Sequence, residues 1–161
     1  MITQQELKEW LHYNPDTGKF EWVKSYHNQR LGKRVGSPDK DGYLTIKVNR
    51  KSYRAHNLAW LYIHGKLPDV ILDHRNGIKD DNSILNLREA TYSGNSQNQR
   101  RAHKDSAHGF IGVDFIRAKN RFRARIQVNG KRVALGGFAT AEAAHEAYLA
   151  AKRKMHPTCT I

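Results

Sequence analysis

Between residues 121 and 128 the side chains alternate strictly between polar and apolar. Successive side chains of a strand point to opposite faces, so this pattern predicts a strand with one arginine-rich face and one apolar face. Asn129-Gly130 then favours a tight hairpin turn, and residues 131–135 return along the first strand. The apolar face therefore needs a cover, while the polar face carries Arg121, Arg123, Arg125 and Gln127.

The expected cover is a helix that begins after Thr140, a residue type favoured at the N-cap. Its small side chains would let the helix lie close to the sheet, and they recur at helical spacing: Ala143, Ala144, Ala147 and Ala151, with Tyr148 among them. From Gly109 onward the sequence thus predicts three strands and one helix. The open arginine face would meet DNA, where a sheet can enter the major groove and arginine can hydrogen-bond guanine.

The pattern of the first 65 residues predicts short helices and strands that are bounded by turn-forming residues and helix caps. Thr3 is an expected N-cap, Asn49-Arg50 an expected turn, and Gly65 an expected helix end. In chain order these elements are a helix carrying Leu7, Trp10 and Leu11, a strand at 19–23, a loop at 26–41, a hairpin at 43–54 and a helix at 57–64.

In the middle of the chain a short apolar run, residues 70–72, leads directly into Asp73-His74. Adjacent residues of a strand point to opposite faces. Asp73 and His74 can therefore serve one site only if the strand ends and turns there, which Asn76-Gly77 favours. The elements expected after this pair are a loop at 75–82, a second strand at 84–88 and a helix, capped by Thr91, that carries Asn95 and Asn98 on one face.

These residue types suit the hydrolysis of a phosphodiester. The reaction needs a deprotonated water and a cation that stabilises charge on the phosphate and the leaving oxygen. An unperturbed imidazole is largely neutral at cellular pH, so His74 can act as the base. The carboxylate of Asp73 and the amide oxygen of Asn95 are hard ligands suited to Mg²⁺. Singly, each residue could be an ordinary loop or surface residue, so the hypothesis depends on their joint spacing.

At this spacing the chain resembles the HNH nucleases of phages and mobile introns, over about residues 13–98. The upstream segments that resemble these proteins are 13–22, 42–56, 58–60 and 65–68. The central residues that carry the resemblance are Val70 to Gly77, Asp81-Asn82, Asn86-Leu87-Arg88, Thr91 and Asn95.

The resemblance implies a ββα-metal core with one divalent metal ion. Asn95 stands where the third letter of the motif is histidine, which favours Mg²⁺ or Mn²⁺ over zinc or nickel. We interpret His56, which also matches a family position, as structural or as a phosphate contact, and Asn98 as a brace of the loop. The implied roles are His74 as general base, Asp73 and Asn95 as metal ligands, and Asn86 as a residue that ties the loop together and helps orient His74.

The C-terminal part is similar to the Apetala-type (ethylene-response-factor) DNA-binding domain, which also accompanies HNH nucleases. This similarity implies that Arg123, Arg125, Gln127 and Arg132 face DNA. Asp114 departs from the pattern, which has arginine there, so a sequence preference is not inherited and a mainly phosphate-contacting sheet stays open. The residues that carry the similarity are Gly112-Val113, 122–126, 135–138, 140–144 and Ala147-Tyr148.

The charge of the chain favours a polyanionic partner. It holds 28 basic and 15 acidic residues, a net charge of +13, and each phosphate that a protein neutralises releases a counterion. Residues 101–161 hold 12 basic and 4 acidic residues, so the C-terminal part is the more basic.

The single cysteine, Cys159, excludes an internal disulfide and a cysteine-built zinc site. With no signal-peptide pattern and no long apolar run, we expect a cytoplasmic protein, in the host cytoplasm if a phage encodes it.

Together these patterns predict an α+β fold: a ββα-metal nuclease core with N-terminal antiparallel strands, then a small three-stranded sheet with a helix. The expected domains are a nuclease at 1–100, with its core at about 68–100, a linker at 101–107 and an Apetala-type domain at 108–157. The expected function is metal-dependent, homing-type cleavage of double-stranded DNA by a monomer. The alternatives are a non-catalytic DNA-binding regulator with a degenerate HNH fold and, less favoured because no exposed aromatic stacking set is evident, an RNA-binding or RNA-cutting protein.

Overall fold

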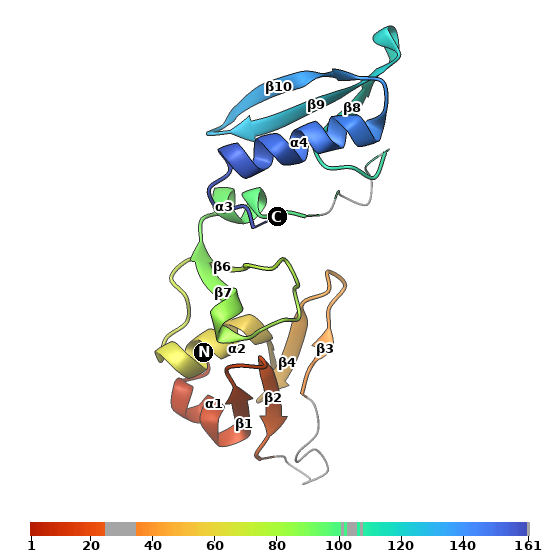
Figure 1. Ribbon diagram of the computed structural model, residues 1–161. Helices are drawn as coiled ribbons and strands as arrows, with labels where there is room; N and C mark the ends of the chain where they lie inside the picture. Colours follow the sequence, from red (N-terminus) through yellow and green to blue (C-terminus); the bar gives the residue numbers. More distant parts are fainter. Residues whose placement is uncertain (25–34, 101, 103–105, 107, 161) are drawn as a thin grey trace. The chain divides into compact units, whose positions relative to one another are not determined.

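The structure is a computed structural model that describes residues 1–24, 35–100, 102, 106 and 108–160 (Figure 1). Residue contacts divide it into two compact units, Met1–Thr91 and Tyr92–Ile161. The two units are described separately, because their positions relative to one another are not determined. Helices and small antiparallel sheets make up both, which confirms the predicted α+β class. Among the described residues, no helix is both long and apolar enough to cross a membrane.

The first unit opens with helix α1 (Gln4–Trp10), which begins at the predicted cap. Thr3 accepts a hydrogen bond from the backbone of Glu6, and the Glu6 carboxylate accepts one from the backbone of Thr3. Leu11, predicted to lie in this helix, is instead the first residue of strand β1 (Leu11–Asn14), which pairs with β2 (Lys19–Trp22). The prediction was wrong here because the apolar spacing indicates only that Leu11 is buried, as it is, and does not distinguish the last residue of a helix from the first residue of a strand.

A three-stranded sheet and a helix follow. The sheet has the order β3-β4-β5, from β3 (Ser37–Pro38), β4 (Leu44–Val48) and β5 (Lys51–Arg54). Asn49 and Arg50 form the predicted turn, both with positive φ. Helix α2 (Ala55–His64) ends at Gly65 in the left-handed conformation, also as predicted. Of the expected loop at 26–41, residues 26–34 lie outside the described residues, and β3 is a short strand that the polar composition did not indicate.

Strands β6 (Ile71–His74) and β7 (Leu87–Ala90) form a separate antiparallel pair. Residues 84–86 of the second predicted strand form instead a 3-10 turn, η1 (Ile84–Asn86). This pair is fixed to the rest of the unit through Leu87, which belongs to the same core as α1, α2 and the N-terminal strands. The largest buried members of that core are Leu7, Leu11, Tyr13, Phe20, Ile46 and Leu58.

The second unit contains the predicted sheet and helix. Its strands are β8 (Val113–Ile116), β9 (Arg121–Val128) and β10 (Lys131–Phe138), in the order β10-β9-β8, with a 3-10 turn η2 (Arg117–Lys119) between the first two. Helix α4 (Ala141–Met155) starts at Thr140, the expected N-cap, and lies along the sheet (Figure 1). Its buried apolar residues pack on the apolar face of β9: Ala141, Ala144, Tyr148 and Ala151.

Helix α3 (Tyr92–Gln97) groups by contacts with the second unit rather than the first. Thr158 donates to the carbonyl of Gly94 at 2.9 Å, and Thr160 donates to the Asn98 side chain at 2.9 Å. By residue contacts, the second unit therefore begins at Tyr92. Most of the linker expected at 101–107 lies outside the described residues.

Candidate functional site

Strand β6 carries Asp73 and His74 as its last two residues, and both are buried. They pair across the sheet with Arg88 and Leu87 of β7. We expected the strand to end at this pair, and the turn follows immediately: the backbone N–H of Gly77 donates to the carbonyl of His74 at 2.9 Å. The two adjacent side chains contact different groups, as the alternation of a strand requires.

Asp73 is ion-paired with Arg88. One carboxylate oxygen, Oδ2, accepts from Arg88 Nη2 at 2.7 Å and from Nε at 3.0 Å. Both side chains are largely shielded from water, so the guanidinium neutralises a buried carboxylate that would otherwise be costly. Arg88 belongs to the residues that carry the HNH resemblance, but sequence reasoning gave it no role. The sequence feature that could have indicated a role is the position of Arg88 in the second predicted strand. The register of that strand with β6 places Arg88 opposite Asp73.

The His74 imidazole lies in a buried group of rings and amides. Its centroid is 5.2 Å from that of His56 and 6.0 Å from that of Tyr43. Its Nε2 lies 3.3 Å from Oδ1 of Asn82, whose own Nδ2 donates to the carbonyl of Asp80. This amide oxygen can only accept, so the contact is a hydrogen bond in the tautomer whose proton is on Nε2, which leaves the lone pair of the neutral ring on Nδ1.

Burial lowers the pKa of His74 below its ordinary value, against the opposing effects of the Asn82 hydrogen bond and the negative charge of Asp73. The ring is therefore neutral at neutral pH and able to accept a proton. Asn82 itself is fully buried and is held by the N-terminal strands. The hydroxyl of Tyr13 donates to the Asn82 carbonyl at 2.7 Å, and the carbonyl of Pro15 accepts from the backbone of Ile84 at 2.9 Å.

His56, at the start of α2, is also buried, and its Nδ1 has no hydrogen-bond partner within the described part of the chain. Burial, followed by the nearby charges of His74 and Arg54, lowers the pKa of His56 to about 3. His56 therefore packs against His74 as a neutral ring over the whole physiological range.

The unfolding free energy of the first unit should consequently fall as the pH drops from 6.5 towards about 3. In this window the unfolded chain binds a proton at His56 that the folded unit does not, which gives a slope of about 1.4 kcal/mol per pH unit. His56→Leu should flatten the profile by that amount. Trp10, Trp22 and Trp60 all lie in the first unit, so tryptophan fluorescence in urea reports its unfolding.

The same replacement at His12, exposed on β1, is the control for losing a histidine elsewhere in this unit. Equal slopes for the wild type and His56→Leu would contradict the assignment of a buried neutral ring at this position.

Asn86 braces the loop between β6 and β7. Its side-chain oxygen accepts from the backbone of Asn76 at 2.9 Å, and its Nδ2 donates to the carbonyl of Asp81 at 2.7 Å. We expected Asn86 both to tie the loop together and to help orient His74. In the structure the amide beside the imidazole is that of Asn82, a residue that carries the resemblance but had no assigned role.

Asn95 is half-buried on α3, which belongs to the second unit. Its amide oxygen, like the carboxylate of Asp73, is a hard oxygen donor of the kind that Mg²⁺ prefers. No group of three or more His, Cys, Asp or Glu residues that could hold a metal occurs within the described ranges.

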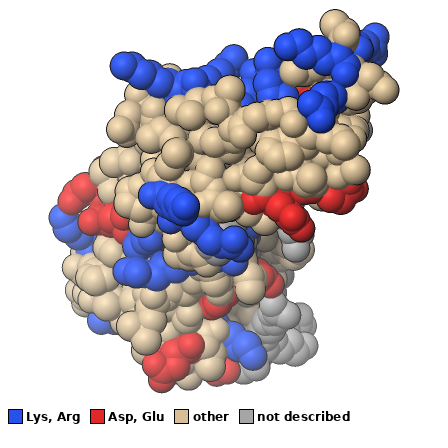
Figure 2. Space-filling view, turned by 45° about the horizontal axis from the view of Figure 1, so that its top comes forward, with Lys and Arg blue, Asp and Glu red and all other residues tan. Residues whose placement is uncertain are grey.

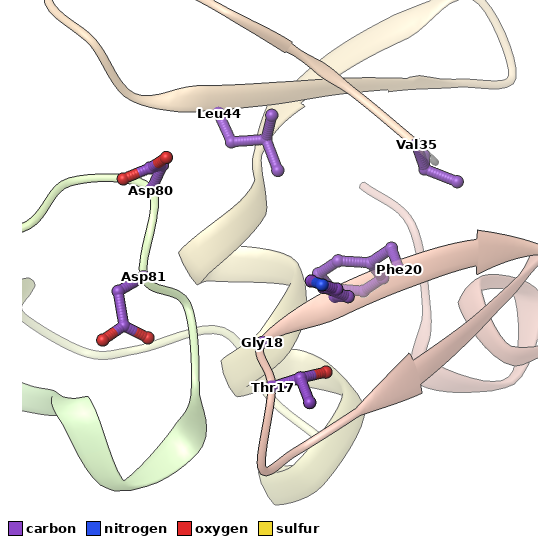
Figure 3. A pocket seen from close by; sticks show the side chains of 8 residues that line it. Thr17, Gly18, Phe20, Val35, Leu44, Asp80 and Asp81 are labelled. Atoms are coloured by element: carbon purple, nitrogen blue, oxygen red, sulfur yellow. The ribbon is translucent and has the colours of Figure 1, made fainter. Parts of the chain in front are cut away.

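A pocket of about 240 Å³ in the first unit lies apart from this pair, since neither Asp73 nor His74 lines it. Asp80 and Asp81 lie on one side of it and the apolar side chains of Phe20, Val35 and Leu44 on the other (Figure 3). The charged residues that line it are Lys19, Asp80 and Asp81, a net negative set that does not favour a phosphate. The Asp81 carboxylate accepts hydrogen bonds from the side chains of Asn76 and Ser83, so it stabilises the loop.

The polar face of β9 is the predicted arginine surface, and Arg132 of β10 lies opposite Gln127 on it. Figure 2 shows Lys and Arg side chains gathered over this sheet. Asp114 of β8 lies among them: its carboxylate accepts from Arg123 at 3.1 Å and from Arg125 at 2.8 and 2.9 Å. All three side chains remain partly exposed. This carboxylate pairs with both guanidinium groups and offsets part of their positive charge.

Residues 53–97 match a family model described as HNH endonuclease. The segment runs from β5 through α3 and contains Asp73, His74, Asn86 and Asn95, so the predicted HNH resemblance is confirmed for this part of the chain. A solved structure described as "DNA binding and cleavage by the HNH homing endonuclease I-HmuI" is 23% identical, with a TM-score of 0.45; the similarity covers 85% of this chain and 76% of that chain. No curated protein matches the chain.

Proposed function

We propose that this chain is a metal-dependent endonuclease that hydrolyses phosphodiester bonds in duplex DNA. The observation that carries the proposal is a buried, neutral His74 beside a buried Asp73, at the end of a strand within the segment that matches HNH endonucleases. The net charge of +13 supports a polyanionic substrate.

In the proposed reaction a water oxygen attacks the phosphorus while Nδ1 of His74 takes a proton of that water. The bond from phosphorus to the 3′ oxygen breaks, and the leaving 3′ oxygen takes a proton from a solvent water. The products are 3′-hydroxyl and 5′-phosphate ends. Asn82 holds the imidazole through Nε2, and Asn86 keeps the loop in shape. Asp73 and Asn95 would hold one divalent ion, Mg²⁺ or Mn²⁺, which when bound supplies positive charge to the phosphate and the leaving oxygen.

Residues 1–100 would form the nuclease domain, and residues 108–157 an Apetala-type DNA-binding domain joined to it by 101–107. The face of its sheet, with Arg121, Arg123, Arg125, Gln127 and Arg132, would contact the duplex. Such a module would direct cleavage to particular sites, and we propose a homing role in a phage or mobile element on this basis.

The test is incubation of supercoiled plasmid, with and without the cognate target, with protein and Mg²⁺, in the presence or absence of EDTA. We expect nicking or linearisation that EDTA abolishes. A non-catalytic DNA-binding regulator is the second candidate, favoured by the Arg88 ion pair that already neutralises Asp73. Absence of metal-dependent cleavage on a plasmid carrying the target would support the regulator, and preference for RNA in a competition assay would exclude duplex DNA as the substrate.

Replacing Arg123 and Arg125 together with alanine should weaken DNA binding and flatten its salt dependence. Each lost phosphate contact lowers the slope of log affinity against log salt by about one. The measurement is fluorescence anisotropy with labelled duplex over a range of KCl concentrations.

The matched control replaces Arg153 and Lys154, two exposed cations on α4, which covers the opposite face of the sheet. A salt slope that drops equally in both double variants would mean that net charge, and not the arginine face, determines binding.

A further inference from the structure

Two cations lie over the ring of Tyr43, next to the imidazole of His74. The guanidinium carbon of Arg54 is 4.4 Å from the Tyr43 ring centroid, and Nζ of Lys79 is 4.7 Å from it. The same ring lies 6.0 Å from that of His74 and 5.5 Å from that of His56. The Tyr43 ring therefore contacts both cations and also lies beside His74, the proposed general base.

Three separate segments build this group. Tyr43 precedes β4 in a turn that Asp39 closes by accepting from the backbone N–H groups of Asp41 and Tyr43. Arg54 is the last residue of β5, immediately before α2, and Lys79 lies in the loop after β6. The fold therefore brings together two cations that stand 25 positions apart in the sequence.

Among the described contacts, Arg54 has one long ion pair and Lys79 has none. Nη2 of Arg54 lies 3.8 Å from a carboxylate oxygen of Asp39, and 46% of the Arg54 side chain is exposed. Lys79 is exposed and donates to the carbonyl of Asp41 at 2.8 Å, an uncharged acceptor. An exposed pair at such a distance contributes little stability, so these charges are poorly explained by folding alone.

We propose that Arg54 and Lys79 form a phosphate-binding site that takes a backbone phosphodiester of the nucleic acid next to the bond that is cut. This inference rests on the proposed nuclease function and deepens it by naming substrate-binding residues. The Tyr43 ring restricts where the two cations can lie, which reduces the entropy lost when they bind an anion. Arginine can donate two parallel hydrogen bonds to a phosphate, and lysine adds a compact charge.

The test compares the wild type with a double variant, Arg54→Ala with Lys79→Ala, in the full chain. In DNA binding without Mg²⁺, the slope of log affinity against log salt should drop by about one for each lost contact. In single-turnover cleavage with Mg²⁺, the rate should drop by about tenfold or more, because the phosphate is less well positioned. The matched control is Lys8→Ala, since Nζ of Lys8 also lies over a tyrosine ring, that of Tyr62, at 5.0 Å.

A DNA series in which single phosphates near the cut are replaced by neutral methylphosphonates identifies the phosphate. One replacement should slow the wild type and leave the double variant unaffected. If the double variant keeps both the slope and the rate of the wild type, the phosphate site is excluded while the nuclease function stands. If no protein cuts DNA but the slope falls only in the double variant, the phosphate site stands and the proposed chemistry fails.

Discussion

Replacing His74 with alanine should lower the rate of DNA cleavage by about 100- to 10,000-fold, the usual contribution of a general base. The affinity for DNA should change by no more than a few fold, because the ring is buried and makes its described contacts within the protein. Single-turnover cleavage of a plasmid measures the first effect, and anisotropy with labelled duplex in EDTA measures the second.

His64 provides the control for this substitution, as an exposed histidine at the end of α2 in the same unit. His64→Ala should cut DNA at the wild-type rate. Tryptophan fluorescence must show that both variants unfold at similar urea concentrations. If His74→Ala loses DNA binding in step with cleavage while remaining folded, His74 contacts the nucleic acid and its assignment as the base is wrong.

Gly18→Ala should lower the unfolding free energy of the first unit by about 3 kcal/mol or more, and cleavage should be lost with it. Gly18 has a φ of +67°, and an added Cβ would lie 2.3 Å from the backbone nitrogen of Ser83 and 2.4 Å from the carbonyl carbon of Asn82. Both neighbours are backbone atoms, so relief requires movement of the segment that places the Asn82 amide against His74. Urea unfolding followed by tryptophan fluorescence measures the stability, and plasmid cleavage measures the function.

Gly65→Ala is a closely matched control. Gly65 also has a positive φ, +76°, but a Cβ there would meet only the Gln4 side chain, at ordinary contact distances from 3.8 Å. It should show the backbone strain alone, about 1 to 2 kcal/mol, with cleavage retained under folding conditions. Equal losses of stability at the two positions would mean that the close approach at Gly18 is not a constraint on the fold.

Much of the fold followed from local patterns. Positive φ at Asn49-Arg50 and Gly65, and the caps at Thr3 and Thr140, depend on neighbouring residues alone. The alternation along β9 also predicted which of its faces the helix covers, because a strand has only two faces.

The contacts of the candidate site were less accessible from sequence because they depend on pairing between distant residues. The ion pair between Asp73 and Arg88 follows from the register of β6 with β7, and the 3-10 turn at 84–86 obscures that register in the sequence. Asn82 and Asn86 are equally polar loop residues in composition. Only the fold determines that the first lies beside His74 and the second braces the loop.

The segment that matches the HNH family model begins at residue 53. The loop that carries Asn82, beside His74, is nevertheless held by hydrogen bonds from residues before that segment. Tyr13 and Pro15, in the N-terminal hairpin, make hydrogen bonds to Asn82 and Ile84. A graft of the matched segment onto another scaffold would carry Asp73, His74 and Asn86 but leave both of these attachments behind. The matched segment therefore depends on contacts from outside it, and a graft would have to include residues 11–22 as well.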